Sequence, residues 1–264
     1  FILGQKQLAP KMAAKFGIPL VFYGENEAEF GNPIADNESA LRDEHFFATN
    51  DFDHIYLGGV SLRQLEEDFH IDKADLAAYL PCETSDVEKN HIQVHYMGYY
   101  ERWHPQGAYY YAVEHGGFMP SPERTVGTYS KYNSIDDKID DFFYYTTYIK
   151  YGIGRCTYDA AQEIRNHEIT RDEGVALCKK FDGEFPMRFA KEVFEYLSID
   201  KKLFGAAADC FEQPQMDLDY FMHLADRFRS PHIWQYANGK WSLRHTPFAG
   251  ESLCGFGAPG AQEA

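Results

Sequence analysis

The stretch Ile18-Pro-Leu-Val-Phe-Tyr-Gly-Glu-Asn-Glu-Ala-Glu-Phe-Gly31 places a short apolar run directly before a turn rich in glycine and carboxylates. The residues before it repeat at helical spacing, with Leu8, Met12 and Phe16 forming one apolar stripe. A continuous apolar run after a helix predicts a strand buried on both faces, as in a parallel α/β sheet. The turn that follows this strand lies where such sheets bind ligands.

Further along, the pattern becomes wholly helical. Ser134 is expected to cap a helix that runs through Ile149 to a stop at Gly152, and Thr157 is expected to open the next helix. Thr170 and Glu173 form the capping box of a third helix. Other expected features are the apolar helix stripes Phe189–Leu197 and Leu218–Phe228 and a hairpin whose turn is Asn238-Gly239.

Between these parts, Ser61 and Gln64 form a capping box, Ile92 to Tyr100 alternates as a strand, and Tyr109 to Glu114 is helical. The polar segment from Asn32 to His54 is expected to be a long loop. The sequence therefore predicts an α/β fold class with a mostly α-helical second domain. Residues 1–105 form the α/β part with its long insert loop, residues 106–247 form the helical domain ending in the hairpin, and residues 248–264 form a flexible tail.

Composition excludes several classes of function. The 264 residues carry 25 Lys and Arg against 41 Asp and Glu, a formal net charge of −16. An acidic chain is a poor ligand for nucleic acid and for anionic membranes, which both require excess positive charge. No apolar run approaches the roughly 18 residues of a membrane helix. The five cysteines are scattered without a C-x-x-C pair, which indicates reduced thiols in a cytoplasmic protein.

The carboxylates after the first strand are the first candidate site. Glu25, Glu27 and Glu29 stand with Asn26 in a glycine-bounded turn. Carboxylate and amide oxygens at a strand end suit a Mg²⁺ ion and the phosphates of its nucleotide. A solvated acidic loop explains the same residues, and the residues alone leave both readings open.

A second candidate site is the segment Gly152-Ile-Gly-Arg155 between two helices. Its glycines permit tight turns, and Arg155 near the start of a helix could bind an anion. The alternative is a helix C-cap followed by an exposed arginine.

Two other clusters are weaker candidates for a metal site. The aspartates at 136, 137, 140 and 141 are better explained by a capping Asp137 and a solvated face. His91 and His95 share a strand face without a third ligand, so we predict no metal site there. Tyrosine-rich stretches could stack a sugar or adenine, although large aromatic residues usually fill cores.

Several stretches together resemble the N-acetyl sugar amidotransferases that modify sugars of surface polysaccharides and nonulosonic acids such as pseudaminic and legionaminic acid. The resemblance covers residues 1 to about 245. The matching stretches are Ile18–Gly31, Tyr96–Tyr100 with Trp103, Gly127–Asp140, Ile149–Thr157, Ile169–Glu173 and Phe228–Trp234.

This resemblance implies a PP-loop ATP pyrophosphatase, with a partial Rossmann-like sheet of the adenine nucleotide alpha hydrolase type. The implied reaction adenylates the N-acetyl oxygen of a sugar or nucleotide sugar with ATP and Mg²⁺, and ammonia then displaces AMP to leave an acetamidino group. The implied ammonia source is a glutaminase partner resembling the imidazole glycerol phosphate synthase pair. Nucleic acid and membrane are not expected as partners.

Residue roles follow from the matching motifs. The resemblance assigns catalysis to Glu25, Asn26 and Glu29, and substrate binding to Tyr99, Trp103 and Tyr129. Nucleotide binding is assigned to Gly24, Lys150, Gly152, Gly154 and Arg155.

The sequence departs from the family in one respect. The family's S-G-G-x-D-S pyrophosphate loop does not occur here, because Gly58-Gly59-Val60-Ser61 lacks the aspartate. The chain is therefore expected to be the carboxy-terminal two-thirds of the enzyme and inactive by itself. Two other hypotheses stay open: a non-catalytic sugar-binding, nucleotide-binding or scaffold protein, and another PP-loop transferase such as a tRNA-thiolating enzyme.

Overall fold

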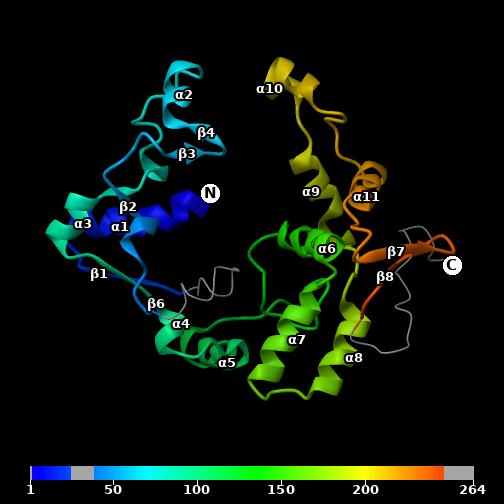
Figure 1. Ribbon diagram of the computed structural model, residues 1–264. Helices are drawn as coiled ribbons and strands as arrows, with labels where there is room; N and C mark the ends of the chain where they lie inside the picture. Colours follow the sequence, from blue (N-terminus) through cyan, green and yellow to red (C-terminus); the bar gives the residue numbers. More distant parts are fainter. Residues whose placement is uncertain (1, 25–38, 247–264) are drawn as a thin grey trace. The chain divides into compact units, whose positions relative to one another are not determined.

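The computed structural model describes residues 2–24 and 39–246 (Figure 1). The chain divides into two compact units, Phe1–Trp103 and His104–Ala264; the described residues of the first unit contain one hydrophobic cluster and those of the second contain two. The residues Glu25, Asn26 and Glu29 and the predicted tail at 248–264 lie outside the described residues.

The first unit combines short helices with short strands. Its α-helices are α1 (Ile2–Phe16), α2 (Leu62–Glu67), α3 (Thr84–Asn90) and α4 (Met97–Tyr100), and its 3-10 helices are η3 (Glu44–Phe46) and η4 (Ala77–Tyr79). Its strands are β1 (Leu20–Tyr23), β2 (Ala48–Thr49), β3 (Tyr56–Leu57), β4 (Val60–Ser61), β5 (Cys82–Glu83) and β6 (Gln93–Tyr96).

Strand β1 pairs in parallel with β6, and Phe22 lies opposite His95 in the register. The parallel pairing and the strand at 20–23 agree with the α/β pattern of the sequence. The expectation that β1 is buried on both faces is wrong, because the side chains of Leu20 and Phe22 are 46% and 50% exposed. Val21 and Tyr23 point to the opposite face and pack against the core of the unit, since neighbouring strand residues alternate between faces.

The other strands form three further pairs. In the first unit β2 pairs in parallel with β5, and β3 pairs antiparallel with β4. The strand predicted over Ile92 to Tyr100 ends at Tyr96, and the remaining four residues form α4. The capping box of Ser61 and Gln64 opens α2 as predicted. The partial Rossmann-like sheet remains a prediction, because the described strands occur only in pairs.

The face of helix α1 that packs against the core is not the face that its apolar stripe indicates. Leu8 and Phe16 are exposed, whereas Gln7 and Ala13 are buried. Small side chains on the inner side let the helix approach the core closely, and the Gln7 amide donates to the Phe46 carbonyl at 3.1 Å. Packing therefore overrides the apolar spacing in this helix.

Helix α1 also contains Pro10, which has no N–H to donate to the carbonyl of Lys6. The hydroxyl of Tyr23, the last residue of β1, donates to that carbonyl at 2.9 Å. A side chain of the strand thus replaces the missing backbone donor of the helix.

The second unit is mainly helical. Its α-helices are α5 (Pro105–Gly116), α6 (Asp140–Tyr151), α7 (Arg155–Arg165), α8 (Arg171–Phe181), α9 (Ala190–Leu197), α10 (Lys201–Phe204) and α11 (Leu218–Arg227). The 3-10 helices η5 (Met187–Phe189) and η6 (Gly205–Cys210) and the strands β7 (Trp234–Ala237) and β8 (Lys240–Leu243) complete it.

Two clusters hold the second unit together. Residues of α6, α9 and α11 form the larger one, around Phe142, Val193 and Phe221. Residues of α7 and α8 form the smaller one, which includes the buried thiols of Cys156 and Cys178. Helices α7 and α8 lie side by side (Figure 1).

The helix starts differ from three predictions. Ser134 does not cap α6, because its φ is +49° and the helix begins six residues later, at Asp140. Asp137 accepts a hydrogen bond from the Ile139 N–H at 2.8 Å, but its predicted capping role is wrong, because Ile139 is the N-cap residue of α6. Thr157 does not open α7 either, since the helix begins at Arg155 with Gly154 as its N-cap.

Other local predictions are confirmed. Gly152 ends α6 with a φ of +73°, and the capping box of Thr170 and Glu173 opens α8. Asn238 and Gly239, both with positive φ, form the turn of the β7–β8 hairpin. The Trp234 indole N–H donates to the Ile149 carbonyl at 2.7 Å, which fixes the hairpin to the end of α6.

Candidate functional site

Arg155 is the centre of a buried polar cluster in the second unit. Its side chain is only 6% exposed. Its Nη1 donates to Ser134 Oγ at 2.9 Å, its Nε lies 3.5 Å from Asp159 Oδ1, and its guanidinium lies 3.8 Å from the centre of the Tyr144 ring. The exposed-arginine alternative for this residue is therefore wrong.

Asp159 connects α7 to the loop that precedes α6. It accepts from the Thr128 hydroxyl at 2.5 Å and from the Asn133 amide at 3.4 Å. Burial raises the pKa of its carboxyl, and the Arg155 guanidinium opposes that rise. Arg155 and Asp159 together fasten the segment Gly127–Asp140 onto α7.

A second ion pair, between Arg124 and Glu184, contacts the same loop at Gly127. Arg124 donates to both carboxylate oxygens of Glu184, at 2.6 and 2.5 Å, and the Gly127 N–H donates to Glu184 at 2.9 Å. Burial raises the pKa of Glu184, but the hydrogen bonds from Arg124 and Gly127 outweigh it and leave the pKa lowered. Such a bidentate pair fixes the orientation of the two side chains as well as neutralising their charges.

Asp182, at the end of α8, caps the first turn of α7. Its carboxylate accepts from the Thr157 N–H at 3.1 Å and from the Thr157 hydroxyl. Burial raises the pKa of Asp182 to about 6. Gly154 makes this contact possible, because a Cβ there would lie 2.9 Å from the Asp182 Cβ and closer still to its carboxylate.

Asp141, in the first turn of α6, is a further buried acid in the same region. Burial raises its pKa to about 6, while Arg188 and Arg155 act in the opposite direction. Carboxyl groups with pKa values near neutrality can exchange protons at physiological pH. The cluster thus combines buried acids with two guanidinium groups.

The space beside Arg155 is small. The cavity lined by Gly127, Asp141, Tyr144 and Arg155 has a volume of about 10 Å³. This volume suits a single water molecule, so a phosphate group does not fit beside the guanidinium in this arrangement. The contact of Arg155 with a phosphate stays a prediction, and we derive no step through ATP at this place.

The remaining predicted nucleotide-binding residues lie in different surroundings. Lys150 is exposed, with its Nζ 5.1 Å from the centre of the Tyr151 ring. Gly152 lies against the hairpin, where a Cβ would come within 2.8 Å of Ile233. Gly24 follows β1, and none of the described residues lies within 4 Å of a Cβ added to it. The structure thus brings Gly154 and Arg155 into the polar cluster, leaves Lys150 on the surface and places Gly24 in the other unit.

The predicted substrate-binding aromatics divide between the units. Tyr99 and Trp103, in the first unit, are 55% and 49% exposed. Tyr129, in the second unit, is half-buried, and burial raises the pKa of its hydroxyl group, as does the nearby Glu163. In the first unit Tyr99 continues an aromatic group at the end of the parallel pair, where His95 Nδ1 lies 2.7 Å from the Tyr100 hydroxyl.

Several residues of the polar cluster were not found by sequence reasoning. The pair Arg155 and Asp159 has the i, i+4 spacing of a helical ion pair, which is the one signal available for Asp159. Arg124 and Glu184 are 60 residues apart, so only the folded chain brings them together. Asp182 has no local signal for its role, since the Thr157 N–H that it accepts from lies 25 residues earlier in the chain.

The described residues contain no group of three or more His, Cys, Asp or Glu side chains that could hold a metal ion. Within the same residues, no helix has the length and apolar character needed to cross a membrane.

Residues 126–246 match the family model described as "LPS biosynthesis protein WbpG-like, C-terminal domain". No curated protein matches the chain. The matched residues include Gly127–Asp140 and Ile149–Thr157, two of the stretches that carry the predicted resemblance. Residues 126–246 are thus similar to the C-terminal domain of WbpG-like lipopolysaccharide-biosynthesis proteins, and this match confirms the resemblance for these residues.

Proposed function

We propose that the protein belongs to an ATP-dependent amidotransferase that converts the N-acetyl group of a sugar into an acetamidino group during surface-glycan biosynthesis. The observation that carries this proposal is the match of residues 126–246 to a lipopolysaccharide-biosynthesis domain. The motif segments that carry the amidotransferase resemblance support this particular reaction within that class.

The polar cluster supports the proposal structurally. Arg155 and Asp159 bind Ser134, Thr128 and Asn133 of the segment Gly127–Asp140. Two motif segments of the resemblance are therefore held against each other as one folded element.

The chemistry explains why such an enzyme needs ATP. An amide oxygen is a poor leaving group, whereas AMP is a good one. Adenylation of the N-acetyl oxygen therefore allows ammonia to displace AMP from the amide carbon. Mg²⁺ offsets the phosphate charge. We assign ATP and Mg²⁺ to the segment Gly24–Gly31, of which the structure describes Gly24. Catalysis is assigned to Glu25, Asn26 and Glu29 of the same segment.

Two further parts of the proposal concern partners and place. A glutaminase partner resembling the imidazole glycerol phosphate synthase pair supplies the ammonia. The reaction takes place in the cytoplasm, where ATP and nucleotide sugars are available.

The test is deletion of the coding sequence in the source organism, followed by mass spectrometry of its surface polysaccharide. We expect the acetamidino group to be replaced by acetamido, with recovery when the gene is restored. An unchanged polysaccharide contradicts the proposal. Loss of thiolated nucleosides from the tRNA of the deletion strain would instead support the tRNA-thiolating alternative.

A further inference from the structure

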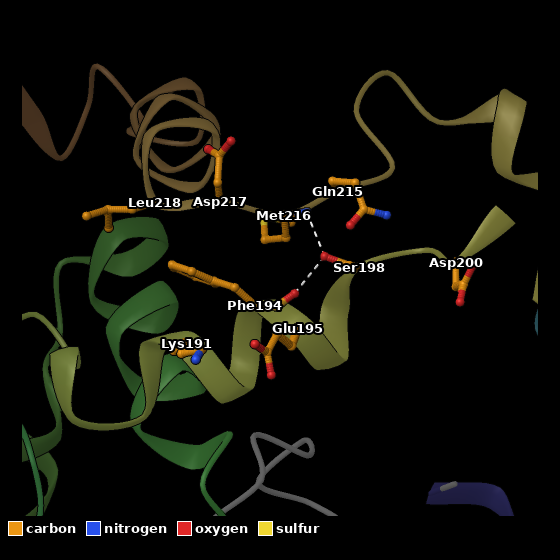
Figure 2. A pocket seen from close by; sticks show the side chains of 9 residues that line it. All are labelled: Lys191, Phe194, Glu195, Ser198, Asp200, Gln215, Met216, Asp217 and Leu218. Carbon is orange, nitrogen blue, oxygen red and sulfur yellow. Dashed lines mark hydrogen bonds between the residues drawn. The ribbon is translucent and has the colours of Figure 1, made fainter. Parts of the chain in front are cut away.

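A groove in the second unit lies apart from the polar cluster around Arg155. It has a volume of about 590 Å³ and runs between the end of α9 and the segment 215–218 that leads into α11 (Figure 2). This volume lies within the range of pockets that bind small molecules. The lining residues are Lys191, Phe194, Glu195, Ser198, Asp200, Gln215, Met216, Asp217 and Leu218.

The two walls of the groove are fixed to each other. The Ser198 hydroxyl donates to the Phe194 carbonyl at 2.8 Å and accepts from the Met216 N–H at 2.8 Å (Figure 2). The Ile199 N–H also donates to the Pro214 carbonyl at 2.7 Å. The groove is thus formed by the fold itself and does not depend on a bound molecule.

Polar groups with defined orientations line its rim. Asp200 Oδ1 accepts from the Lys202 N–H and Asp217 Oδ1 accepts from the Tyr220 N–H, both at 2.8 Å. These caps hold the carboxylates in place and leave lone pairs available to a ligand. Glu195 adds a third carboxylate from α9, one helical turn after Lys191.

The lining indicates the chemical class of the ligand. The three carboxylates are good acceptors for sugar hydroxyl groups. Lys191 can donate to an amide carbonyl, and so can the second N–H of the Gln215 amide, whose first N–H donates to the Ile199 carbonyl at 3.3 Å. Met216 and Leu218, which are only partly buried against the core, supply an apolar surface on which an acetyl methyl group can rest.

We propose that this groove binds the acetamido-bearing sugar ring of the acceptor. The inference rests on the proposed function and locates its sugar on α9 and the segment before α11.

The test measures binding of two probes, methyl N-acetyl-glucosaminide and methyl N-acetyl-galactosaminide, to the full chain. Saturation-transfer NMR detects contact with the acetyl methyl group, and calorimetry gives Kd. We expect transfer to the acetyl methyl of at least one probe and markedly weaker binding of methyl glucoside, which lacks the acetamido group.

Variants on α9 show whether the groove is responsible. Glu195→Gln should weaken binding about tenfold, because it removes a charged acceptor without changing the shape. Glu192→Gln is the matched control, since Glu192 lies on the same helix, pairs with Lys138 and does not line the groove. Lys191→Gln removes the charged donor of the groove and should also weaken binding, and thermal melting verifies that every variant is folded.

Each outcome decides the proposal. Absence of saturation transfer from both probes overturns it, and so does equal affinity of the Glu195→Gln and Glu192→Gln variants. Either result can occur while deletion of the gene still removes the acetamidino group, in which case the proposed function stands and the sugar binds elsewhere.

Discussion

Replacement of Arg155 by methionine tests the role of the buried cluster most directly. Methionine fills similar space but removes the charge and all of the donors. The change leaves Asp159 without its guanidinium partner, although the hydrogen bonds from Thr128 and Asn133 remain. It also leaves the Ser134 hydroxyl without its donor.

The expected magnitude follows from the burial of the pair. Arg155 is 6% exposed, so water cannot replace the lost partner of Asp159. Breaking a buried pair by removing one member costs about 3–5 kcal/mol of the free energy of unfolding. Arg155→Lys retains the charge but loses the planar contact with Tyr144 and one hydrogen bond, so we expect a loss of about 2 kcal/mol.

The assay is urea unfolding at pH 7, followed by circular dichroism. The double variant Arg155→Met with Asp159→Asn removes both charges, and we expect it to be at least about 1 kcal/mol more stable than the sum of the single changes indicates. An Arg155→Met variant within about 0.5 kcal/mol of the wild type would refute the reasoning. Additive single changes would show that the two residues do not interact.

Three further predictions concern the same unit and the whole chain. Gly154→Ala should lower the free energy of unfolding by about 1–3 kcal/mol, because its Cβ meets Asp182. Gly116→Ala is the control, because its Cβ has open space, and it should change the free energy of unfolding by less than about 1 kcal/mol. Equal melting temperatures of the two variants would contradict this prediction. Asp182 has a pKa of about 6 in the fold and about 3.9 in the unfolded chain, so the folded state binds more protons between these values and loses stability as pH rises from about 4 to 6. Asp182→Asn should remove about 2 kcal/mol of that decrease in the free energy of unfolding. An identical pH profile of the variant and the wild type would contradict this prediction. The isolated chain should release no pyrophosphate from ATP, since it lacks the S-G-G-x-D-S loop whose backbone amides would bind that group, and a coupled pyrophosphate assay with clear turnover would prove this wrong.

The features that sequence predicts well here depend on neighbouring residues. The capping boxes at Ser61 and Thr170 are formed as expected. The turn at Asn238-Gly239 follows from the positive φ that both residues tolerate. In each case the hydrogen bonds or the backbone angles involve residues within a few positions of one another, so the local sequence contains the information.

The features that sequence misses depend on distant residues. The N terminus of α7 is capped by Asp182, 25 residues later, so Thr157 is not needed as a cap. The Ser134 hydroxyl accepts a hydrogen bond from Arg155, 21 residues away, and does not cap α6. The polar cluster itself therefore could not be assembled from spacing alone, although two of its members, Gly154 and Arg155, could be identified.

Pro10 has a consequence for the end of β1. The Tyr23 hydroxyl holds the carbonyl that the proline leaves vacant, so the last residue of β1 is tied to the middle of α1. The end of β1 is thus linked to α1 by the hydrogen bond from Tyr23 to the Lys6 carbonyl. A tilt of α1 would act on the end of β1 through this hydrogen bond, and Tyr23→Phe would remove it.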